Sequence, residues 1–248
     1  MSYIKVKNPV QPIKTESKAP DRIEDTLVIL DCVRKLDPYA AVMLEMQYVT
    51  GLRFSDVRTL TFNDFEDRFG PKSSFTVIQN KIFNSSMTRL NTANKRRSAS
   101  GEPVLSEKAM EARAARKAKV EIIITPYMRD IVTYCDKYQG LNQYSDGVLL
   151  FASPHKRSRG APYRTEYVNK LLKSPELTEL LRKASPNLTN RNLGTHSFRR
   201  AFGTELLHKG ANVKLIMELL GQSSLESTAK YLQNSQEQKT HFLEQIGH

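Results

Sequence analysis

The segment Gly194–Tyr231 constrains the fold of this chain more than any other stretch of its sequence. Apolar side chains recur at helical spacing across residues 198–207 and again across residues 213–220, which predicts two consecutive amphipathic helices. The first helix carries His196 and Arg199 three residues apart, so both side chains point the same way. Two donor groups that converge on one point indicate a bound anion, of which phosphate is the commonest. The tyrosine that ends the segment is then a candidate nucleophile.

The overall charge of the chain indicates a polyanionic partner. The 248 residues carry a formal net charge of +12, and the isoelectric point is about 9.7. Charge alone leaves DNA, RNA and an anionic membrane surface as alternatives, beside a basic protein that has no polyanionic partner. The hydrophobic fraction of 39% is enough for a real core in one large or two small domains.

Several classes of protein are disfavoured by this sequence. No apolar run approaches the roughly 20 residues of a membrane-spanning helix, and the N-terminal residues lack the apolar region of a signal peptide. We therefore expect a cytoplasmic protein with no membrane partner. Cys32 and Cys135 are far apart and predict reduced, buried thiols. The histidines and cysteines show no metal-ligand spacing, so we predict no metal site.

The first part of the chain predicts an arm followed by helices. Residues 1–20 are rich in Lys and Pro and lack periodicity, which predicts a flexible basic arm that DNA or a partner orders, with a plain flexible tail as the alternative. Asp37-Pro38 is a helix start and Thr50-Gly51 a helix end. The helix between them is apolar almost all round and should lie at the centre of the core.

Arg53 follows this helix directly, at the junction with a short helix that Ser55 or Asp56 caps. Its neighbours Leu52 and Phe54 are apolar, which indicates a partly desolvated guanidinium that needs an anionic partner. An ordinary surface charge is the alternative.

Residues 84–119 interrupt a predicted β-hairpin. The strand within residues 73–83 has alternating apolar side chains, with Lys81 at its far end, where the hairpin should turn. Residues 120–125 form the returning strand. The insertion between them is basic, and we expect a loop in its first half, a helix in its second half, and mobility without a ligand.

Basic side chains in this insertion, in the loop over residues 153–164 and beside Arg199 are candidates for contact with the DNA backbone. They are Arg96, Arg97, Lys117, Lys156, Arg157, Arg159 and Arg200. A solvated charged surface is the alternative for each, and a salt bridge is a further alternative for Arg200.

Three boxes of the sequence together resemble the tyrosine recombinases, the phage integrase family. They are Thr50–Asp56, Thr195–Phe202, and Leu220–Ser224 followed by Thr228 and Tyr231. Any one box alone is weak, but their combination in this order, across residues 21–235, is highly specific. The resemblance implies a mainly helical α+β catalytic domain with a small antiparallel sheet. The residues themselves predict the N-terminal arm of residues 1–20 before this domain and a tail helix over residues 236–248 after it.

The resemblance also implies a role for each candidate in catalysis. Arg53 and Arg199 would clamp the oxygens of the scissile phosphate. His196 would accept a proton or donate a hydrogen bond, and Tyr231 would attack phosphorus. The product is a 3′-phosphotyrosyl bond that conserves the energy of the phosphodiester, so neither metal, ATP nor another cofactor is needed.

Lys81 matches the mobile lysine of the family, which protonates the leaving 5′ oxygen. Lys95, Lys117 and Lys119 are rivals for that role, because the insertion blurs the correspondence. Asp56 matches the acidic position that supports the first arginine.

The chain departs from the family pattern in two respects. Gln222 stands where the family has His or Trp; its amide donates hydrogen bonds but does not titrate, so slower or partner-dependent activity is expected. In addition, only about twenty residues precede the catalytic pattern, where the family has a helical core-binding domain. An excised fragment and a compact recombinase are the two alternatives.

The implied function is site-specific recombination of double-stranded DNA, as in an integrase of a mobile genetic element. The family expectation is a homotetramer on two duplexes, a monomer or weak oligomer without DNA, and accessory DNA-bending proteins. Three alternative functions are a type IB topoisomerase, a DNA-binding factor that has lost catalysis, and an RNA-binding basic protein. Gln222 is the best support for the second of these.

Overall fold

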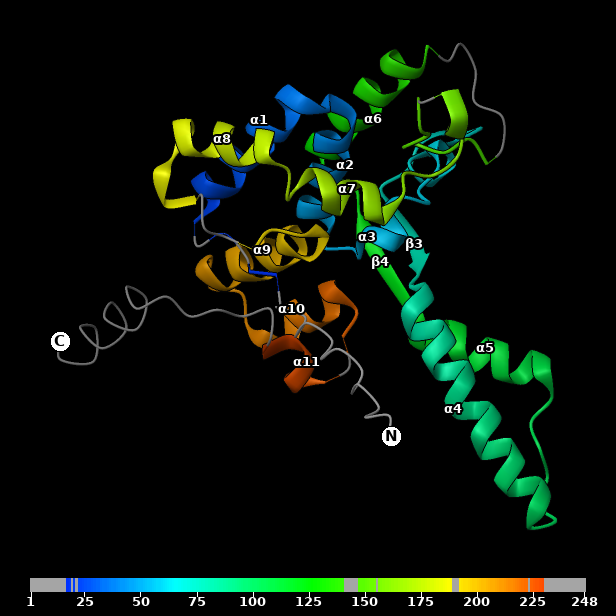
Figure 1. Ribbon diagram of the computed structural model, residues 1–248. Coiled ribbons are helices and arrows are strands. Elements are labelled where there is room, and N and C mark those ends of the chain that lie inside the picture. The colour runs from blue at the N-terminus through cyan, green and yellow to red at the C-terminus, as the bar shows by residue number, and fades with distance from the viewer. Residues whose placement is uncertain are drawn as a thin grey trace, which may run out of the picture.

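The computed structural model describes residues 17–18, 20, 22–140, 147–154, 156–188, 192–222 and 224–229 (Figure 1). Most of the predicted N-terminal arm, the predicted tail helix over residues 236–248, and Tyr231 lie outside these residues. No helix in the described ranges combines the length and apolar character needed to cross a bilayer.

The described elements follow one another from α1 to α11, with the strands grouped in the first half of the chain. In order they are α1 (Ile23–Leu36), α2 (Pro38–Thr50), α3 (Phe54–Val57), the 3-10 helix η1 (Phe62–Asp64), β1 (Glu66–Asp67), β2 (Gly70–Pro71), β3 (Ser74–Ile78), α4 (Asn80–Ala99), α5 (Glu107–Ala118), β4 (Lys119–Ile123), α6 (Pro126–Gln139), η2 (Lys156–Ser158), α7 (Thr165–Leu171), α8 (Pro175–Ala184), η3 (Pro186–Leu188), α9 (Thr195–His208), α10 (Val213–Leu220) and α11 (Leu225–Ala229).

Helix α2 lies at the centre of the core, as its apolar composition predicts. It begins after Asp37, whose side chain accepts a hydrogen bond from the backbone N–H of Ala40, and it has Pro38 in its first turn. It packs against α1, α3, α6 and α9, and most of its residues are buried. Both cysteines are free and buried, which agrees with the prediction for them.

The sheets are small and antiparallel, which confirms the predicted mainly helical α+β class. Strand β3 pairs with β4 from Ser74 opposite Ile123 to Ile78 opposite Lys119, and β1 pairs with β2. The hairpin predicted around the basic insertion is therefore present, with the returning strand where the sequence placed it.

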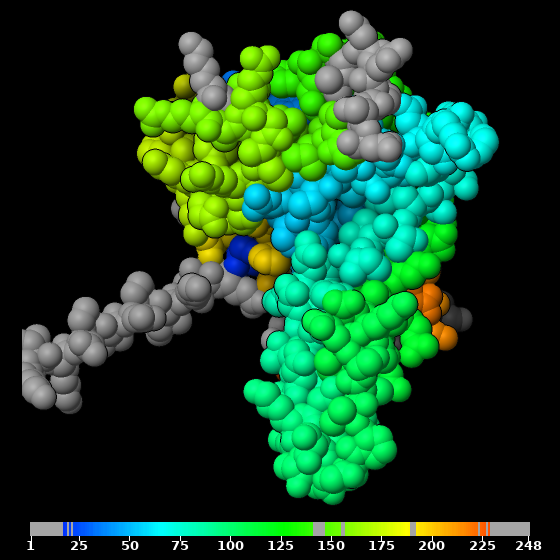
Figure 2. Space-filling model, turned by 90° about the vertical axis from the view of Figure 1, so that its right-hand side faces the viewer, coloured from blue at the N-terminus to red at the C-terminus, as the bar shows by residue number. Residues whose placement is uncertain are grey.

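The insertion itself differs from the prediction. Its first half, predicted to be a loop, lies in α4, which runs for 20 residues and packs against α5 to form a helical hairpin. From here on, the arm means this hairpin of α4 and α5 and not residues 1–20. The arm projects from the body of the molecule in Figure 1 and Figure 2. Lys81, expected at a strand turn, is the second residue of α4.

Contacts with α5 explain why weak helix formers are helical here. The side chain of Asn94 accepts from the backbone N–H of Leu105 at 3.0 Å and donates to the carbonyl of Leu105 at 2.8 Å. Met110 and Ala114 of α5 are buried at the junction of the two helices. Tertiary packing thus outweighs the local preference of Asn, Ser and Thr for turns.

Candidate active site at the base of the arm

Arg199 is the most deeply buried charged side chain of the candidate site. It lies in the second turn of α9 and has 0% of its surface exposed. Its Nη2 donates to the carbonyl oxygen of Leu220 at 2.7 Å, and its Nη1 donates to the carbonyl oxygen of Gly51. A single guanidinium therefore joins the three boxes that the sequence singled out.

The carbonyl of Gly51 is held in place by the way α2 ends. Gly51 caps α2 with φ 64°, in the left-handed region that favours glycine. A Cβ at this position would lie 2.4 Å from Cδ1 of Phe202 on α9. Glycine thus allows α2 and α9 to approach closely enough for Arg199 to reach the carbonyl.

Gln79 joins Arg53 to the same assembly. Nη1 of Arg53 donates to Oε1 of Gln79, and Nε2 of Gln79 donates to the carbonyl of Leu220 at 3.3 Å. Gln79 has 0% of its surface exposed, and its backbone N–H donates to the carbonyl of Ala118 at 3.0 Å. Sequence reasoning did not select Gln79, because its partners lie far away along the chain.

Asp56 connects the site to the first residue of the arm. Its carboxylate is buried, with 1% of the residue exposed, and Oδ1 accepts from the backbone N–H of Asn80 at 3.3 Å. Burial raises the pKa of this carboxyl, whereas the Asn80 N–H, Arg53 and Arg199 act in the opposite direction. A carboxylate at the N-terminus of α4 also interacts favourably with the helix dipole.

His196 lies in a strongly positive environment. Desolvation lowers the pKa of its imidazole, and the positive charges of Arg199, Lys81, Arg200 and Arg53 lower it further. His196 is exposed to solvent, and its lowered pKa favours the neutral imidazole at pH 7.

The same electrostatic neighbours show which predicted residues come together. Arg53 immediately precedes α3, Lys81 lies in the first turn of α4, and His196 and Arg199 lie in α9. The charges of Arg53, Lys81 and Arg199 all act on the imidazole of His196. Figure 2 shows a recess beside the base of the arm, in which the gold colour of the segment that begins α9 is visible.

Gln222 lies next to a hollow of about 420 Å³ between α10, β4 and the start of α4. Lys117 and Lys119 also line this hollow, and Oε1 of Gln222 is buried without a hydrogen-bond partner in the described part of the chain. A phosphate contact of Gln222 stays a prediction.

The candidates for DNA contact differ in exposure. Arg96, Lys117, Arg157 and Arg159 are exposed, Arg97 is half-buried, and Arg200 is buried with 6% of its surface exposed. The exposure of Lys156 lies outside the described side chains. The buried charge of Arg200 therefore helps to lower the pKa of His196. Because it is buried, Arg200 is a weaker candidate for phosphate contact than the exposed arginines.

Comparisons with known proteins point to one family. The sequence matches the family profile described as "Phage integrase family" over residues 22–238. Tyrosine recombinase XerC of Rickettsia typhi is 33% identical over 111 residues, which are 44% of this chain and 32% of the relative. XerC of Bacillus pumilus is 41% identical over 73 residues, or 29% of this chain and 21% of the relative. The aligned regions thus span about a third or less of these relatives.

Solved structures share the fold at low sequence identity. XerA recombinase has a TM-score of 0.58 and 14% identity, and the match covers 96% of this chain and 66% of XerA. The Tn1549 transposon integrase in complex with transposon right end DNA has a TM-score of 0.59 and 17% identity, covering 96% and 69%. A lambda integrase tetramer bound to a Holliday junction has a TM-score of 0.53 and 17% identity, covering 90% and 51%.

Proposed function

Because the chain belongs to the phage integrase family, we propose that it is a site-specific DNA recombinase that cleaves and rejoins strands through Tyr231. The observation that carries this proposal is the hydrogen-bonded network in which Arg199 and Gln79 share the carbonyl of Leu220 and Gln79 accepts from Arg53. The positive charge of Lys81 acts on the exposed His196 beside this network. Such a group of cations fits a phosphodiester, whose negative charge repels a nucleophile unless it is neutralised.

The two arginines stabilise the charge that develops on the phosphate. Their positions are set by hydrogen bonds to Gln79, Gly51 and Leu220. Loss of one such preorganised donor costs about 10²-fold or more in rate. Arg199 is fully covered in this structure, so a phosphate oxygen reaches it only after the covering groups move. Arg53 is partly exposed and meets the phosphate first.

The proton transfers follow from the electrostatics of the site. The phenolic oxygen of Tyr231 forms a bond to phosphorus, and the bond from phosphorus to the 5′ oxygen breaks. The phenolic proton passes to the neutral imidazole of His196, and Lys81 gives a proton to the leaving oxygen. Attack by a 5′-hydroxyl of the partner strand reverses these steps and restores the phosphodiester.

The substrate we propose is double-stranded DNA, bound by a homotetramer that holds two duplexes. The net charge of +12 and the exposed basic side chains support a polyanion. The DNA complexes of the Tn1549 integrase and of the lambda integrase tetramer support the same class of substrate and assembly.

A trap for the covalent intermediate tests the proposal. Duplexes with a randomised central region, each nicked so that a short 5′-hydroxyl fragment diffuses away after cleavage, are incubated with the protein and separated under denaturing conditions. We expect a covalent protein–DNA adduct that disappears in Tyr231→Phe. It should persist in the control Tyr134→Phe, which removes the hydroxyl of an exposed tyrosine on α6.

The outcome separates the rival functions. No adduct on any duplex, with DNA binding intact, favours a DNA-binding factor, which the glutamine at position 222 supports. An adduct accompanied by relaxation of supercoiled plasmid, without exchange between two duplexes, favours a type IB topoisomerase. Tighter binding to an RNA duplex than to a DNA duplex contradicts the DNA-binding factor and the topoisomerase, and it favours an RNA-binding protein.

A further inference from the structure

We propose that the outer face of α4 binds the phosphate backbone of duplex DNA beside the cleavage site. This face contains Lys81, Arg89, Lys95 and Arg96, all of which are exposed. The proposal rests on the proposed function only in placing the cleaved phosphate at Lys81; the binding surface itself is tested without cleavage.

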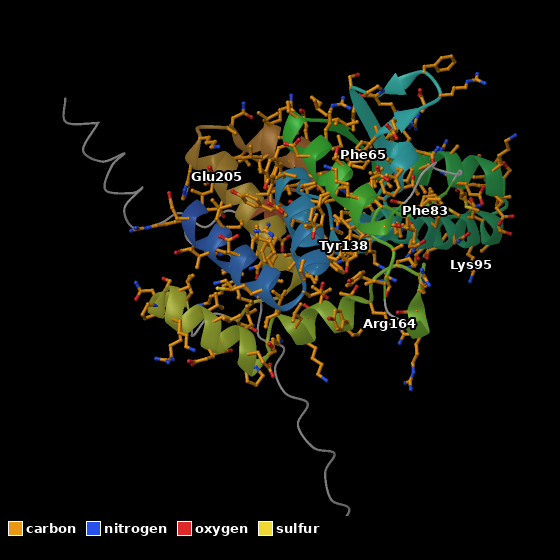
Figure 3. The ribbon with its side chains drawn as sticks, turned by 90° about the horizontal axis from the view of Figure 1, so that it is seen from above. Phe65, Phe83, Lys95, Tyr138, Arg164 and Glu205 are labelled. Atoms are coloured by element: carbon orange, nitrogen blue, oxygen red, sulfur yellow. The ribbon has the colours of Figure 1, made fainter. Side chains whose placement is uncertain are left out.

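Helical geometry places these four cations together. At about 100° per residue, Lys81, Arg89, Lys95 and Arg96 fall within an arc of about 120°. The opposite side of α4 contains the buried Ser86 and packs against α5. The four cations therefore point away from α5. In Figure 3, Lys95 on the arm and Arg164 on the body lie on the same side of the molecule.

The composition of this face favours a phosphate partner over solvent alone. Helix α4 contains no acidic residue, whereas α5 carries Glu107 and Glu111 among its cations. Between the cations of the outer face stand hydroxyl residues such as Thr88 and Thr92. Their hydroxyls donate to the helix backbone at 3.0 and 2.9 Å. Because these hydroxyl protons are already used within the helix, we expect the charged side chains to make the contacts with DNA phosphates.

The base and the tip of the arm are both held by hydrogen bonds. Asp56 binds the N-terminus of α4 at Asn80, and Gln79 binds the end of α5 at Ala118. At the tip, Asn94 holds the connecting loop through Leu105. Cations on a helix whose position is already fixed by hydrogen bonds lose less conformational freedom on binding than cations on a flexible loop.

The length of the outer face predicts the extent of the contact. From Lys81 to Arg96 the helix rises about 22 Å. Duplex DNA rises about 3.4 Å per base pair, so a helix that runs along the duplex covers roughly six base pairs. Lys81 at the base acts on His196, so the contact begins at the candidate site and extends away from it.

Salt dependence measures these contacts directly. We expect the variant Arg89→Gln, Lys95→Gln, Arg96→Gln to bind a 30-base-pair duplex of mixed sequence more weakly. The slope of log affinity against log salt concentration, between 50 and 200 mM, should fall in magnitude by about 2 to 3, because each phosphate contact contributes about 0.9. Glutamine is a good helix former, so the arm should stay folded.

The matched control removes the same charge from the other helix of the arm. Lys108→Gln, Arg113→Gln, Arg116→Gln replaces three exposed cations of α5 and should change the slope by less than about 1. Equal changes in the two triple variants mean that overall charge, and not the face of α4, determines binding, and this overturns the proposal. A loss confined to RNA duplex also overturns it.

Cross-linking tests the face independently of affinity. Thr92 lies in the middle of the outer face and Ala112 on the side of α5 away from its buried residues, and both are exposed. Single cysteines at these positions are coupled to a photoreactive group; Cys32 and Cys135 are buried and should not react. We expect cross-links to duplex DNA from Thr92→Cys and few from Ala112→Cys. The reverse order contradicts the proposal.

The two proposals fail separately. If no covalent adduct forms but the α4 variant has the reduced salt slope, the proposed function fails and the DNA-binding face stands. If the adduct forms and the α4 variant keeps the wild-type slope, the face is wrong and the recombinase stands.

Discussion

Nη2 of Arg199 donates a hydrogen bond of 2.7 Å to the carbonyl oxygen of Leu220, the last residue of α10. The same carbonyl accepts from Nε2 of Gln79, and Oε1 of Gln79 accepts from Arg53. One backbone oxygen thus links the two arginines of the candidate site through neutral groups. Gly221 follows with φ 59°, and a Cβ there would lie 2.2 Å from Cγ2 of Val120 and 2.8 Å from Nε2 of Gln79.

Arg199→Lys should destabilise the fold although it keeps the charge. An ammonium does not reproduce the fork that reaches Gly51 and Leu220 at once, and each hydrogen bond to a charged group contributes about 1.5–3 kcal/mol. We expect a loss of about 2–4 kcal/mol in the free energy of unfolding, measured with urea. Arg182→Lys, an exposed arginine paired with Glu179 on α8, should change it little.

Gln79→Leu should lower DNA cleavage more than DNA binding. The variant removes the hydrogen bonds that Gln79 makes to Arg53 and to the Leu220 carbonyl, at a cost of about 1–3 kcal/mol each. We expect a roughly 10-fold or greater drop in the rate of adduct formation at saturating DNA, with affinity nearly unchanged. An equal loss of affinity contradicts a positioning role.

Gln139→Leu is the matched control for this prediction. Nε2 of Gln139 donates to the hydroxyl of Tyr39 at 2.6 Å and to the carbonyl of Leu150 at 2.8 Å. The change has similar chemistry and should lower stability, but these partners lie in the part of the core next to α6. Adduct formation should therefore stay near the wild-type rate.

Gly51→Ala should cost more stability than Gly140→Ala. Both glycines end a helix in the left-handed region, with φ 64° and 63°, so both substitutions carry the same backbone strain of about 1 kcal/mol. Nothing lies within 4 Å of a Cβ at Gly140, whereas one at Gly51 meets Phe202. We expect Gly51→Ala to lose about 1–3 kcal/mol more in urea unfolding, because the added methyl overpacks the contact. Equal losses contradict the close approach of α2 and α9.

His196 should make stability depend on pH in the acidic range. Its pKa is lowered in the folded protein, so below pH 6.5 the unfolded chain binds a proton first, and stability falls as the pH falls toward the folded pKa. Above pH 6.5 both states are neutral and the contribution is constant. The difference in unfolding free energy between wild type and His196→Gln, followed from pH 7.5 to 5.0, isolates this effect. A difference that does not change with pH means that the surrounding cations do not act on the imidazole.

The sequence predicted the features that depend on near neighbours. The cap at Asp37, the proline after it and the glycine at position 51 mark the ends of α2, because capping and left-handed backbone are decided within a few residues. The helical period of α9 likewise placed Arg199 and His196 near each other. The resemblance carried by the three boxes is confirmed by the match to the phage integrase family.

The prediction failed where distant contacts decide the outcome. A loop was expected in residues 84–99 because Asn, Ser and Thr favour turns, yet α5 makes these residues helical and Asn94 finds both its partners in Leu105. Gln79 was missed because its partners come from Arg53 between α2 and α3, from α5 and from α10.

By itself, then, the sequence determined the family and the ends of α2, and it named the catalytic candidates, since each of these depends on residue types at short spacing. Only the tertiary structure decided that Arg199 donates to carbonyls 148 and 21 residues away, and that Lys81 starts a projecting helix. The physical reason is that a buried guanidinium takes whichever acceptors the packed elements present to it, and local sequence does not specify that packing.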